Sequence, residues 1–473
     1  MTHLTEQQPS LLQPGNHLHL VGIGGAGMSA IAQVLLGRGF TVSGSDQQAN
    51  ERTAALEAAG ATVYVGHRGE QVAGANGLII SSAVPETNPE VTAARTNGQP
   101  ILKRSDLLGL LMEGLTGIAV AGSHGKTTTT GMIAQILLTA QLDPTFIIGS
   151  ELPSLGTNGR FGRGDHFVVE ADEYDHMFLG LRPTLAVITN LEHDHPDIFP
   201  TELAYQTAFR QFVALLPENG RLITCYDDEG ARQLLEIIQP PPPQILTYGL
   251  QPGADLIASE IRPNQLGGVD FMVQQGEQLV GLARLRLPGD HNVRNALAAI
   301  AVGLDLGLDF NTIRQALADF GGMKRRFQVT GEVGGVVVID DYAHHPTEIR
   351  ATLAAARQRY SGRRLWAVWQ PHTFSRTKLL LSEFATCFNE ADQVVALDIY
   401  HSRETDTLGI NTAVVLQTMN HPHATYTPSH KEAADYILDR VRPSDVVLTL
   451  GAGDGNLVGQ WVLTGLRQKI GNQ

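Results

Sequence analysis

The feature that most constrains this chain is a strand–glycine turn–helix pattern that occurs twice. The first turn, Gly22-Ile-Gly-Gly-Ala-Gly27, follows the strand-like run 17–21, and the second, Gly122-Ser-His-Gly-Lys-Thr-Thr128, follows the run 117–121. Glycines let the backbone approach a phosphate closely, and the start of the next helix supplies N–H donors and the positive end of a dipole. The sequence therefore predicts two phosphate-binding turns on α/β sheets.

Strand-like runs with little polar alternation recur between helical patterns, for example at 166–170, 365–369 and 446–450. Such strands are typical of parallel sheets that helices cover on both faces. A chain of 473 residues also exceeds the size at which one hydrophobic core keeps growing. We therefore expect three α/β domains with boundaries near 112 and 326, an antiparallel appendage over 255–287, and a flexible leader over 1–16.

Composition excludes several classes of protein. A formal net charge of −14 leaves no general basic footprint for nucleic acid. No apolar stretch is long enough to insert into a membrane, and the polar N-terminus does not resemble a secretory signal. The only cysteines, Cys225 and Cys387, lie far apart, which argues against a disulfide or a zinc site. A reducing cytoplasm is the expected location.

The first turn is followed by a carboxylate at a diagnostic distance. Asp46 lies 19 residues after Gly27, at the end of the next strand-like run, where a ribose-binding carboxylate is expected. The pattern predicts a nucleotide diphosphate, but alone it does not distinguish a nicotinamide dinucleotide from a UDP-sugar. A glycine turn that serves packing only remains an alternative.

The second turn carries the residues expected of an ATP loop. Lys126 can neutralise the β- and γ-phosphates, and the hydroxyl of Thr127 can bind Mg²⁺. The turn departs from the full Gly-x-x-x-x-Gly-Lys-Ser/Thr pattern, because Val120 stands where the first glycine is expected. The strand–turn–helix context still favours ATP over a purely structural turn.

Acidic residues follow the next two strands of the same segment. Glu170 belongs to Val-Glu-Ala-Asp-Glu-Tyr-Asp175, and Glu192, Asp194 and His195 belong to Thr189-Asn-Leu-Glu-His-Asp-His195. The carboxyl ends of neighbouring parallel strands meet at one edge of a sheet, so these side chains should lie beside the phosphate turn. We expect Glu170 and His195 to bind Mg²⁺. For Glu192 and Asp194 a solvated acidic loop is an equally open interpretation.

Three further polar loops each precede a helical pattern. They are Leu287-Pro-Gly-Asp-His-Asn-Val-Arg-Asn295, Asp340-Asp-Tyr-Ala-His-His-Pro-Thr-Glu348 and Gln370-Pro-His-Thr-Phe-Ser-Arg-Thr377. The guanidinium of Arg376 can bind a carboxylate in two-point fashion. Helix capping and packing remain open as the role of all three loops.

Taken in order, these motifs resemble the Mur ligase family from about Leu18 to Leu457. The stretches that carry the resemblance are GIGGAGMSAIA, SGSD, AGSHGKTTTT, VEADEYD, TNLEHDHPD, LPGDHNVRNALAA, KRRF, DDYAHHPTE, QPHTFSRT and LGAGD. The resemblance implies an ATP- and Mg²⁺-dependent ligase of peptidoglycan precursor synthesis. It would join the carboxylate of UDP-N-acetylmuramate to L-alanine through an acyl phosphate, as a monomer or homodimer.

The resemblance also implies the domain roles. Residues 1–111 would form a Rossmann-like UDP-sugar domain, residues 112–325 a central P-loop-type ATP domain with a mostly parallel sheet, and residues 326–473 a Rossmann-like domain for the amino acid and ATP.

The family's site residues can be carried over onto matching positions. The UDP-sugar would be bound by Gly24, Gly25, Ala26, Gly27, Met28, Ser29, Asp46, His67, Ser81 and Ser82. ATP would be bound by Gly122, Ser123, His124, Gly125, Lys126, Thr127, Thr128, Asn190, Asn292, Asn295 and Asp341. The metal ligands would be Thr127, Glu170 and His195. L-alanine would be bound by Tyr342, His344 and Arg376, and the catalytic residues would be Lys126, His344 and Arg376.

Several alternatives remain at this stage. A family member that attaches a tripeptide to the same UDP-sugar would usually carry a cysteine in the first turn, and none is present. A folylpolyglutamate synthetase would lack the amino-terminal unit. A nicotinamide-dependent oxidoreductase would leave Lys126 and Thr127 unexplained, and a regulatory nucleotide sensor would bind ATP without releasing phosphate.

Overall fold

The computed structural model describes residues 11–239, 242 and 244–471. Its contacts divide the chain into two compact units, each of which is described by itself. The first comprises residues 1–192, 205–255 and 298–316, and the second comprises residues 193–204, 256–297 and 317–473.

The predicted leader is only partly open to comparison, because residues 1–10 lie outside the described residues. The prediction of a flexible leader is wrong for residues 11–16. Leu11 is buried and packs against Gly77, whose added Cβ would lie 2.8 Å from a Leu11 methyl carbon. The side-chain amide of Asn16 donates to the Leu11 carbonyl at 3.0 Å. The apolar contact therefore ties this segment to the first sheet, and the hydrogen bond connects the two ends of the segment to each other.

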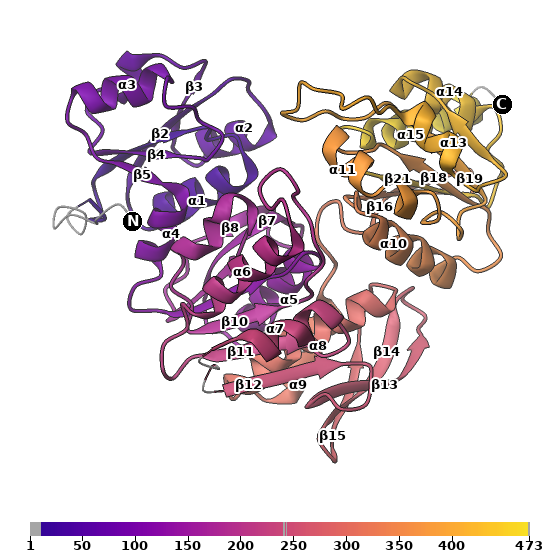
Figure 1. The fold of residues 1–473 in the computed structure, drawn as a ribbon, viewed down its shortest axis with the longest axis horizontal. Helices are drawn as coiled ribbons and strands as arrows, with labels where there is room; N and C mark the ends of the chain where they lie inside the picture. The colour runs from indigo at the N-terminus through magenta and orange to yellow at the C-terminus, as the bar shows by residue number, and fades with distance from the viewer. Residues whose placement is uncertain (1–10, 240–241, 243, 472–473) are drawn as a thin grey trace. The chain divides into compact units, whose positions relative to one another are not determined.

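The first unit begins with a parallel sheet of strand order β3-β2-β1-β4-β5 (Figure 1). Its strands are β1 (His17–Val21), β2 (Thr41–Asp46), β3 (Thr62–Val65), β4 (Gly77–Ile80) and β5 (Ile101–Lys103). Its helices are α1 (Ala26–Gly37), α2 (Glu51–Ala58), α3 (Pro89–Thr96) and α4 (Arg104–Leu111). Because all five strands run in one direction, the residues that follow them share one edge of the sheet.

The first unit also contains strands in the order β12-β11-β10-β6-β9-β7-β8. They are β6 (Thr116–Ala121), β7 (Thr145–Leu152), β8 (Thr157–Arg160), β9 (His166–Glu170), β10 (Leu185–Ile188), β11 (Arg221–Cys225) and β12 (Gln244–Gly249). All neighbours are parallel except the β7–β8 hairpin. The associated helices include α5 (Lys126–Thr139), α6 (Glu202–Val213) and α7 (Glu229–Ile237). The edge that follows β6, β9 and β10 carries the second glycine turn and the acidic motifs.

The second unit contains an antiparallel ribbon and a third sheet. The ribbon is formed by β13 (Leu256–Pro263), β14 (Val269–Gln275) and β15 (Gln278–Arg284), which confirms the predicted appendage. The sheet has the order β16-β17-β21-β18-β19-β20, and only β16 is antiparallel to its neighbour. These strands are β16 (Gln328–Val333), β17 (Val336–Asp341), β18 (Leu365–Trp369), β19 (Gln393–Ala396), β20 (Ala424–Tyr426) and β21 (Val446–Leu450).

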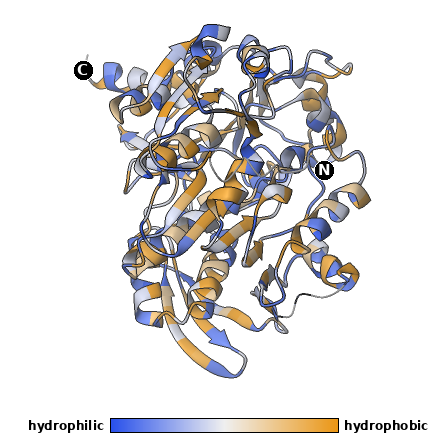
Figure 2. Ribbon diagram, turned by 90° about the vertical axis from the view of Figure 1, so that its left-hand side faces the viewer, coloured by the Kyte–Doolittle hydropathy of each residue, from blue (hydrophilic) through white to orange (hydrophobic). Residues whose placement is uncertain are grey.

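Apolar residues line the strands and the inward faces of the helices (Figure 2). In the third sheet one face packs under α10 (Pro346–Arg359), where Ile349 and Leu353 contact the core around Trp369. The other face packs under α14 (His430–Leu438) and α15 (Asn456–Gly471), where Val458 and Val462 contact the core around Trp366. The predicted α/β fold class is confirmed. Among the described residues, no helix combines the length and apolarity needed to cross a bilayer.

Candidate active site

The first glycine turn is tied to the end of β2. The backbone N–H of Gly24 donates to the Asp46 carboxylate at 2.9 Å, and the Gly24 carbonyl accepts from Arg52 Nε at 2.7 Å. An added Cβ at Gly24 would lie 2.9 Å from that carboxylate, so the turn has no room for a side chain. In this structure Asp46 therefore braces the turn.

Several predicted UDP-sugar residues meet at the same edge. Ser81 follows β4 and lies beside Gly22, and His67 follows β3. The side chains of Met28 and Ser29 are buried, so at these positions only the backbone at the start of α1 can face a ligand. Ser82 is exposed.

One cation at this turn was missed by the reasoning from sequence. Arg104 begins α4, directly after β5, and its guanidinium lies against Gly27: a Cβ there would fall 2.0 Å from Arg104 Nη1. The same guanidinium lies 3.3 Å from the Asp172 carboxylate. Its position after a parallel strand was the available signal, because residues there share the edge with the turn.

The second turn requires glycine for two physical reasons. Gly122 has φ +131°, and an added Cβ would lie 2.1 Å from Thr189 Oγ1. Gly125 has φ +80° and is the N-cap of α5. Both φ angles are in the region that residues other than glycine rarely adopt. The turn thus carries no side chain at its two glycines and is followed by the first N–H groups of a helix. These N–H groups have no intrahelical acceptor.

Asn190 braces this turn through both ends of its amide. Its oxygen accepts from the backbone N–H of His124 at 2.8 Å, and its nitrogen donates to the His124 carbonyl at 3.1 Å. The hydroxyl of Ser123 contacts Tyr205 at 2.8 Å and the Glu192 carbonyl at 2.7 Å. The contacts seen for Asn190 are with the turn itself.

The side chain of Lys126 folds back over its own turn. Its ammonium donates to the carbonyl oxygens of Gly122 and Ser123 and forms an ion pair with Glu173 at 2.8 Å. Burial alone would lower the pKa of Lys126, but the Glu173 carboxylate outweighs it and raises that pKa. The side chain of Glu173 is fully buried. Glu173 was not among the predicted residues, although it lies in the predicted acidic motif.

Thr127 and Glu170 form a pair suited to Mg²⁺. The Thr127 hydroxyl donates to the Glu170 carboxylate at 3.0 Å, and the other carboxylate oxygen accepts from the Gly149 N–H at 2.6 Å. A hydroxyl and a carboxylate are hard oxygen ligands of the kind Mg²⁺ prefers beside phosphate. The glycine at 149 is needed because a Cβ would lie 2.7 Å from Glu170 Oε2. The residues present therefore fit the metal.

In the second unit, Arg376 is bound to a carboxylate of the protein. Its Nε and Nη2 lie 3.0 and 2.9 Å from Asp194 Oδ1, and both side chains are buried. Burial would raise the pKa of Asp194, but the Arg376 guanidinium, followed by His195, holds it well below its usual range. A solvated loop is therefore the wrong interpretation for Asp194. In the first unit, Glu192 contacts His124 Nε2 at 2.9 Å and is partly exposed.

A group of rings lies beside Arg376. His372 contacts Arg376 Nη1 at 3.2 Å, and the ring of His344 makes edge contacts with those of His372 and Tyr342. Burial lowers the pKa of His344 well below its ordinary value, and burial followed by Arg376 lowers that of His372 to about 4. At neutral pH these imidazoles are uncharged, which leaves the guanidinium as the local positive charge.

Of the remaining predicted residues of this unit, Asp341, Asn292 and Asn295 are buried. Asp341 accepts from the N–H groups of Phe327 and Ala343 at 2.7 and 2.8 Å, and burial raises its pKa to about 6. At the start of α8 (Asp290–Asp305), Asn292 donates to the Pro288 carbonyl at 2.8 Å and lies beside Asn295. His195 has φ +55° and is partly exposed.

The structure thus brings most of the predicted residues into three groups. In the first unit one group surrounds the first turn and another surrounds the second turn with Glu170 and Asn190. In the second unit a third group contains Arg376, His344 and Tyr342.

Three protein-family models match successive parts of the chain. The model named Mur ligase family, catalytic domain, matches residues 17–116, Mur ligase middle domain matches 120–303, and Mur ligase, glutamate ligase domain, matches 325–453. The chain belongs to the Mur ligase family and has its three-domain α/β architecture.

Two relatives in particular indicate which branch of the family the chain is similar to. The UDP-N-acetylmuramate–L-alanine ligase of Desulfosudis oleivorans is 42% identical over 452 residues, covering 95% of this chain and 98% of its own. The crystal structure of UDP-N-acetylmuramate–alanine ligase from Thermotoga maritima has a TM-score of 0.80, with 29% identity over 96% of this chain and 99% of that one. A murein peptide ligase from Psychrobacter arcticus is less similar, with a TM-score of 0.73, 27% identity, and coverage of 96% of this chain and 99% of that one.

Proposed function

We propose that this protein uses ATP and Mg²⁺ to join the carboxylate of UDP-N-acetylmuramate to the amine of L-alanine in peptidoglycan precursor synthesis. The observation that carries the proposal is the second glycine turn, where Lys126 and the Thr127–Glu170 pair converge at the start of α5. A nucleoside triphosphate and its metal can be bound at a helix start by a lysine, a hydroxyl and a carboxylate. The similarity to alanine ligases over nearly the whole chain supports the choice of substrates.

The reaction would begin at the second turn. The muramate carboxylate attacks the γ-phosphorus of ATP, the bond to the β-phosphate oxygen breaks, and an acyl phosphate and ADP result. Lys126 and the N–H groups at the start of α5 would stabilise the negative charge that spreads over the phosphoryl oxygens. Mg²⁺ at Thr127 and Glu170, and at His195, would neutralise phosphate charge when bound.

The second step requires a neutral alanine amine and a positioned carboxylate. The amine attacks the acyl carbon, the bond to phosphate breaks, and the amine loses a proton. His344 could accept that proton, because its Nδ1 faces the Tyr342 carbonyl at 3.0 Å and therefore carries the ring proton, which leaves Nε2 as a base. Arg376 would bind the alanine carboxylate in place of Asp194.

The test is phosphate release from ATP with UDP-N-acetylmuramate, measured against each of the twenty amino acids. Release should depend on both the sugar nucleotide and L-alanine, and the product should gain one alanine by mass. Release with the peptide L-Ala-γ-D-Glu-meso-diaminopimelate but not with L-alanine would overturn the proposal in favour of a peptide ligase.

A further inference from the structure

A chain of hydrogen bonds, buried at His19 and Glu90, runs along one part of the first unit. His17 Nε2 lies 2.7 Å from Ser43 Oγ, and Ser43 Oγ lies 2.7 Å from His19 Nδ1. His19 Nε2 lies 2.9 Å from Glu90 Oε1, and both of these side chains are fully buried. The chain thus leads from β1 and β2 to the first turn of α3, where Glu90 lies.

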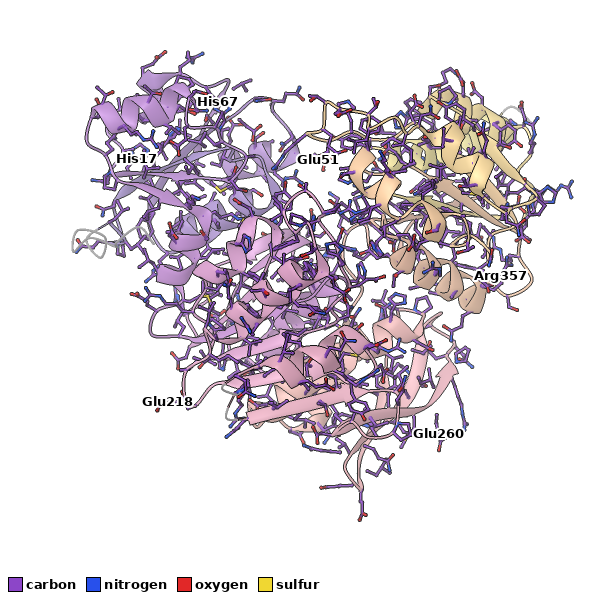
Figure 3. The ribbon with its side chains drawn as sticks, viewed as in Figure 1. His17, Glu51, His67, Glu218, Glu260 and Arg357 are labelled. Atoms are coloured by element: carbon purple, nitrogen blue, oxygen red, sulfur yellow. The ribbon has the colours of Figure 1, made fainter. Side chains whose placement is uncertain are left out.

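The second carboxylate oxygen of Glu90 has a different set of partners. Ser45 Oγ donates to Glu90 Oε2 at 2.7 Å, and His67 Nδ1 lies 2.8 Å from the same oxygen. Ser45 Oγ is also 2.9 Å from His67 Nδ1. The rings of His17 and His67 are labelled in Figure 3. Glu90 therefore joins a buried histidine to a histidine at the edge of the sheet.

These contacts determine which nitrogen of His67 carries the proton. Burial alone would raise the pKa of Glu90, but its hydrogen bonds with His19 and Ser45 outweigh burial and lower that pKa, so the carboxylate is ionised. An ionised carboxylate only accepts hydrogen bonds. The ring nitrogen that faces it, Nδ1 of His67, must therefore be the protonated one. In the neutral ring Nε2 is then an acceptor.

The acceptor nitrogen belongs to a side chain at the edge of the sheet that carries the first turn. His67 follows β3 at the edge shared with the first turn and Asp46, and its side chain is 19% exposed. Among residues 11–239, 242 and 244–471, no hydrogen-bond partner is found for Nε2. In such sheets the diphosphate lies on the turn after β1 and the ribose carboxylate at the end of β2. Strand β3 neighbours β2, so His67 lies on the ribose side of the turn.

We propose that Glu90 is a positioning residue that makes the first domain select uracil. By keeping the proton of His67 on Nδ1, it leaves Nε2 to accept a hydrogen bond from N3–H of the base. Uracil has a proton on N3, whereas cytosine has a lone pair there, so cytosine would place one acceptor against another. The inference rests on the proposed function, because that function supplies a uridine nucleotide.

The decisive measurement is the affinity of the full chain for UDP and for CDP, by titration calorimetry. The unaltered protein should bind UDP at least about tenfold more tightly than CDP, since an unmatched polar pair in a partly desolvated site is costly. Glu90→Gln conserves the side-chain volume but offers an amide that can donate to the ring. It should weaken UDP binding about tenfold and strengthen CDP binding, because a proton on Nε2 can be donated to the N3 lone pair of cytosine.

His17→Gln is the matched control, because it alters the same network at the end remote from His67. It should leave the ratio of UDP to CDP affinity unchanged, and thermal unfolding of both variants reports any loss of fold. A readout that requires no Glu90 variant is ¹⁵N NMR of the histidine rings, assigned with His67→Gln. The His67 signals should show a proton on Nδ1 in the unaltered protein and a changed tautomer ratio in Glu90→Gln.

The outcomes separate the inference from the proposed function. Equal binding of UDP and CDP, a proton on Nε2 of His67, or the same loss of selectivity in both variants would overturn the role of Glu90 alone. Failure of the unaltered protein to bind UDP at all would overturn the proposed function as well.

Discussion

The two glycine turns have the same sequence pattern and different surroundings. Both connect a buried parallel strand to a helix, but the first helix starts from Gly25 in an extended conformation and the second from Gly125 with φ +80°. The first turn is braced by a carboxylate, Asp46, and contains no charged side chain of its own. The second contains Lys126, which is paired with buried Glu173.

This difference teaches how a shared backbone motif acquires distinct chemistry. Backbone N–H groups and a helix dipole are sufficient to bind a phosphate. Phosphoryl transfer also moves negative charge onto the phosphoryl oxygens. To stabilise that charge, the turn needs a cation and metal ligands. We therefore expect changes at the second turn to act on catalysis and changes at the first turn to act on binding of the sugar nucleotide.

The largest effect is expected from Lys126→Met. Removal of the ammonium should lower kcat for phosphate release by about a thousandfold, because the charge that spreads over the phosphoryl oxygens loses its protein cation. The measurement is steady-state phosphate release with saturating substrates. Lys431→Met, at an exposed helical lysine, serves as the control. Retention of more than a tenth of kcat would contradict the role given to this turn.

A smaller effect is expected from Glu170→Gln, which removes the negative charge beside Thr127. We expect kcat to fall about a hundredfold and the Mg²⁺ concentration for half-maximal rate to rise, since a metal ligand is weakened. A magnesium titration of phosphate release measures both, with Glu218→Gln as an exposed control. An unchanged magnesium dependence would remove Glu170 from the metal site.

Gly24→Ala tests the first turn by steric crowding. The added Cβ would lie 2.7 Å from Asn50 Nδ2 and 2.9 Å from Asp46 Oδ2, so the turn must shift. We expect the KM for UDP-N-acetylmuramate to rise about tenfold while kcat changes little. Gly321→Ala is the control, because a Cβ there meets nothing within 4 Å. A loss confined to kcat would break the comparison between the turns.

The smallest effect is expected from Arg104→Gln. Its guanidinium lies against Gly27 and is partly exposed, so its charge should contribute only about a fivefold increase in affinity for the sugar nucleotide diphosphate. Equilibrium binding of UDP-N-acetylmuramate would measure this change. Arg95→Gln, at an exposed arginine of α3 in the same unit, should have no effect. If Arg104→Gln binds normally, the first turn acts through its backbone alone.

The comparison also shows how far reasoning from sequence extends. Strands 17–21, 166–170, 365–369 and 446–450 coincide with β1, β9, β18 and β21, because continuous apolar runs between glycine turns are a local signal. The proximity of Thr127 to Glu170 was also predictable, since residues after neighbouring parallel strands meet at one edge.

Other contacts had no local signal. Asp194 and Arg376 are 182 residues apart in sequence and form a buried ion pair, and the sequence alone suggested a solvated loop for Asp194 as readily as a site. Leu11 appeared to belong to a flexible leader, yet it packs against Gly77. Such contacts depend on how distant segments approach one another, which no short pattern encodes.

The sequence by itself determined the family, the parallel sheets and the position of both phosphate-binding turns, because strand periodicity and glycine turns act over a few residues. Only the tertiary structure decided the partners of the charged groups: Glu173 for Lys126, Asp194 for Arg376 and Glu90 for His67. The physical reason is that a buried charge requires an oppositely charged or hydrogen-bonding partner, and folding supplies that partner from elsewhere in the chain.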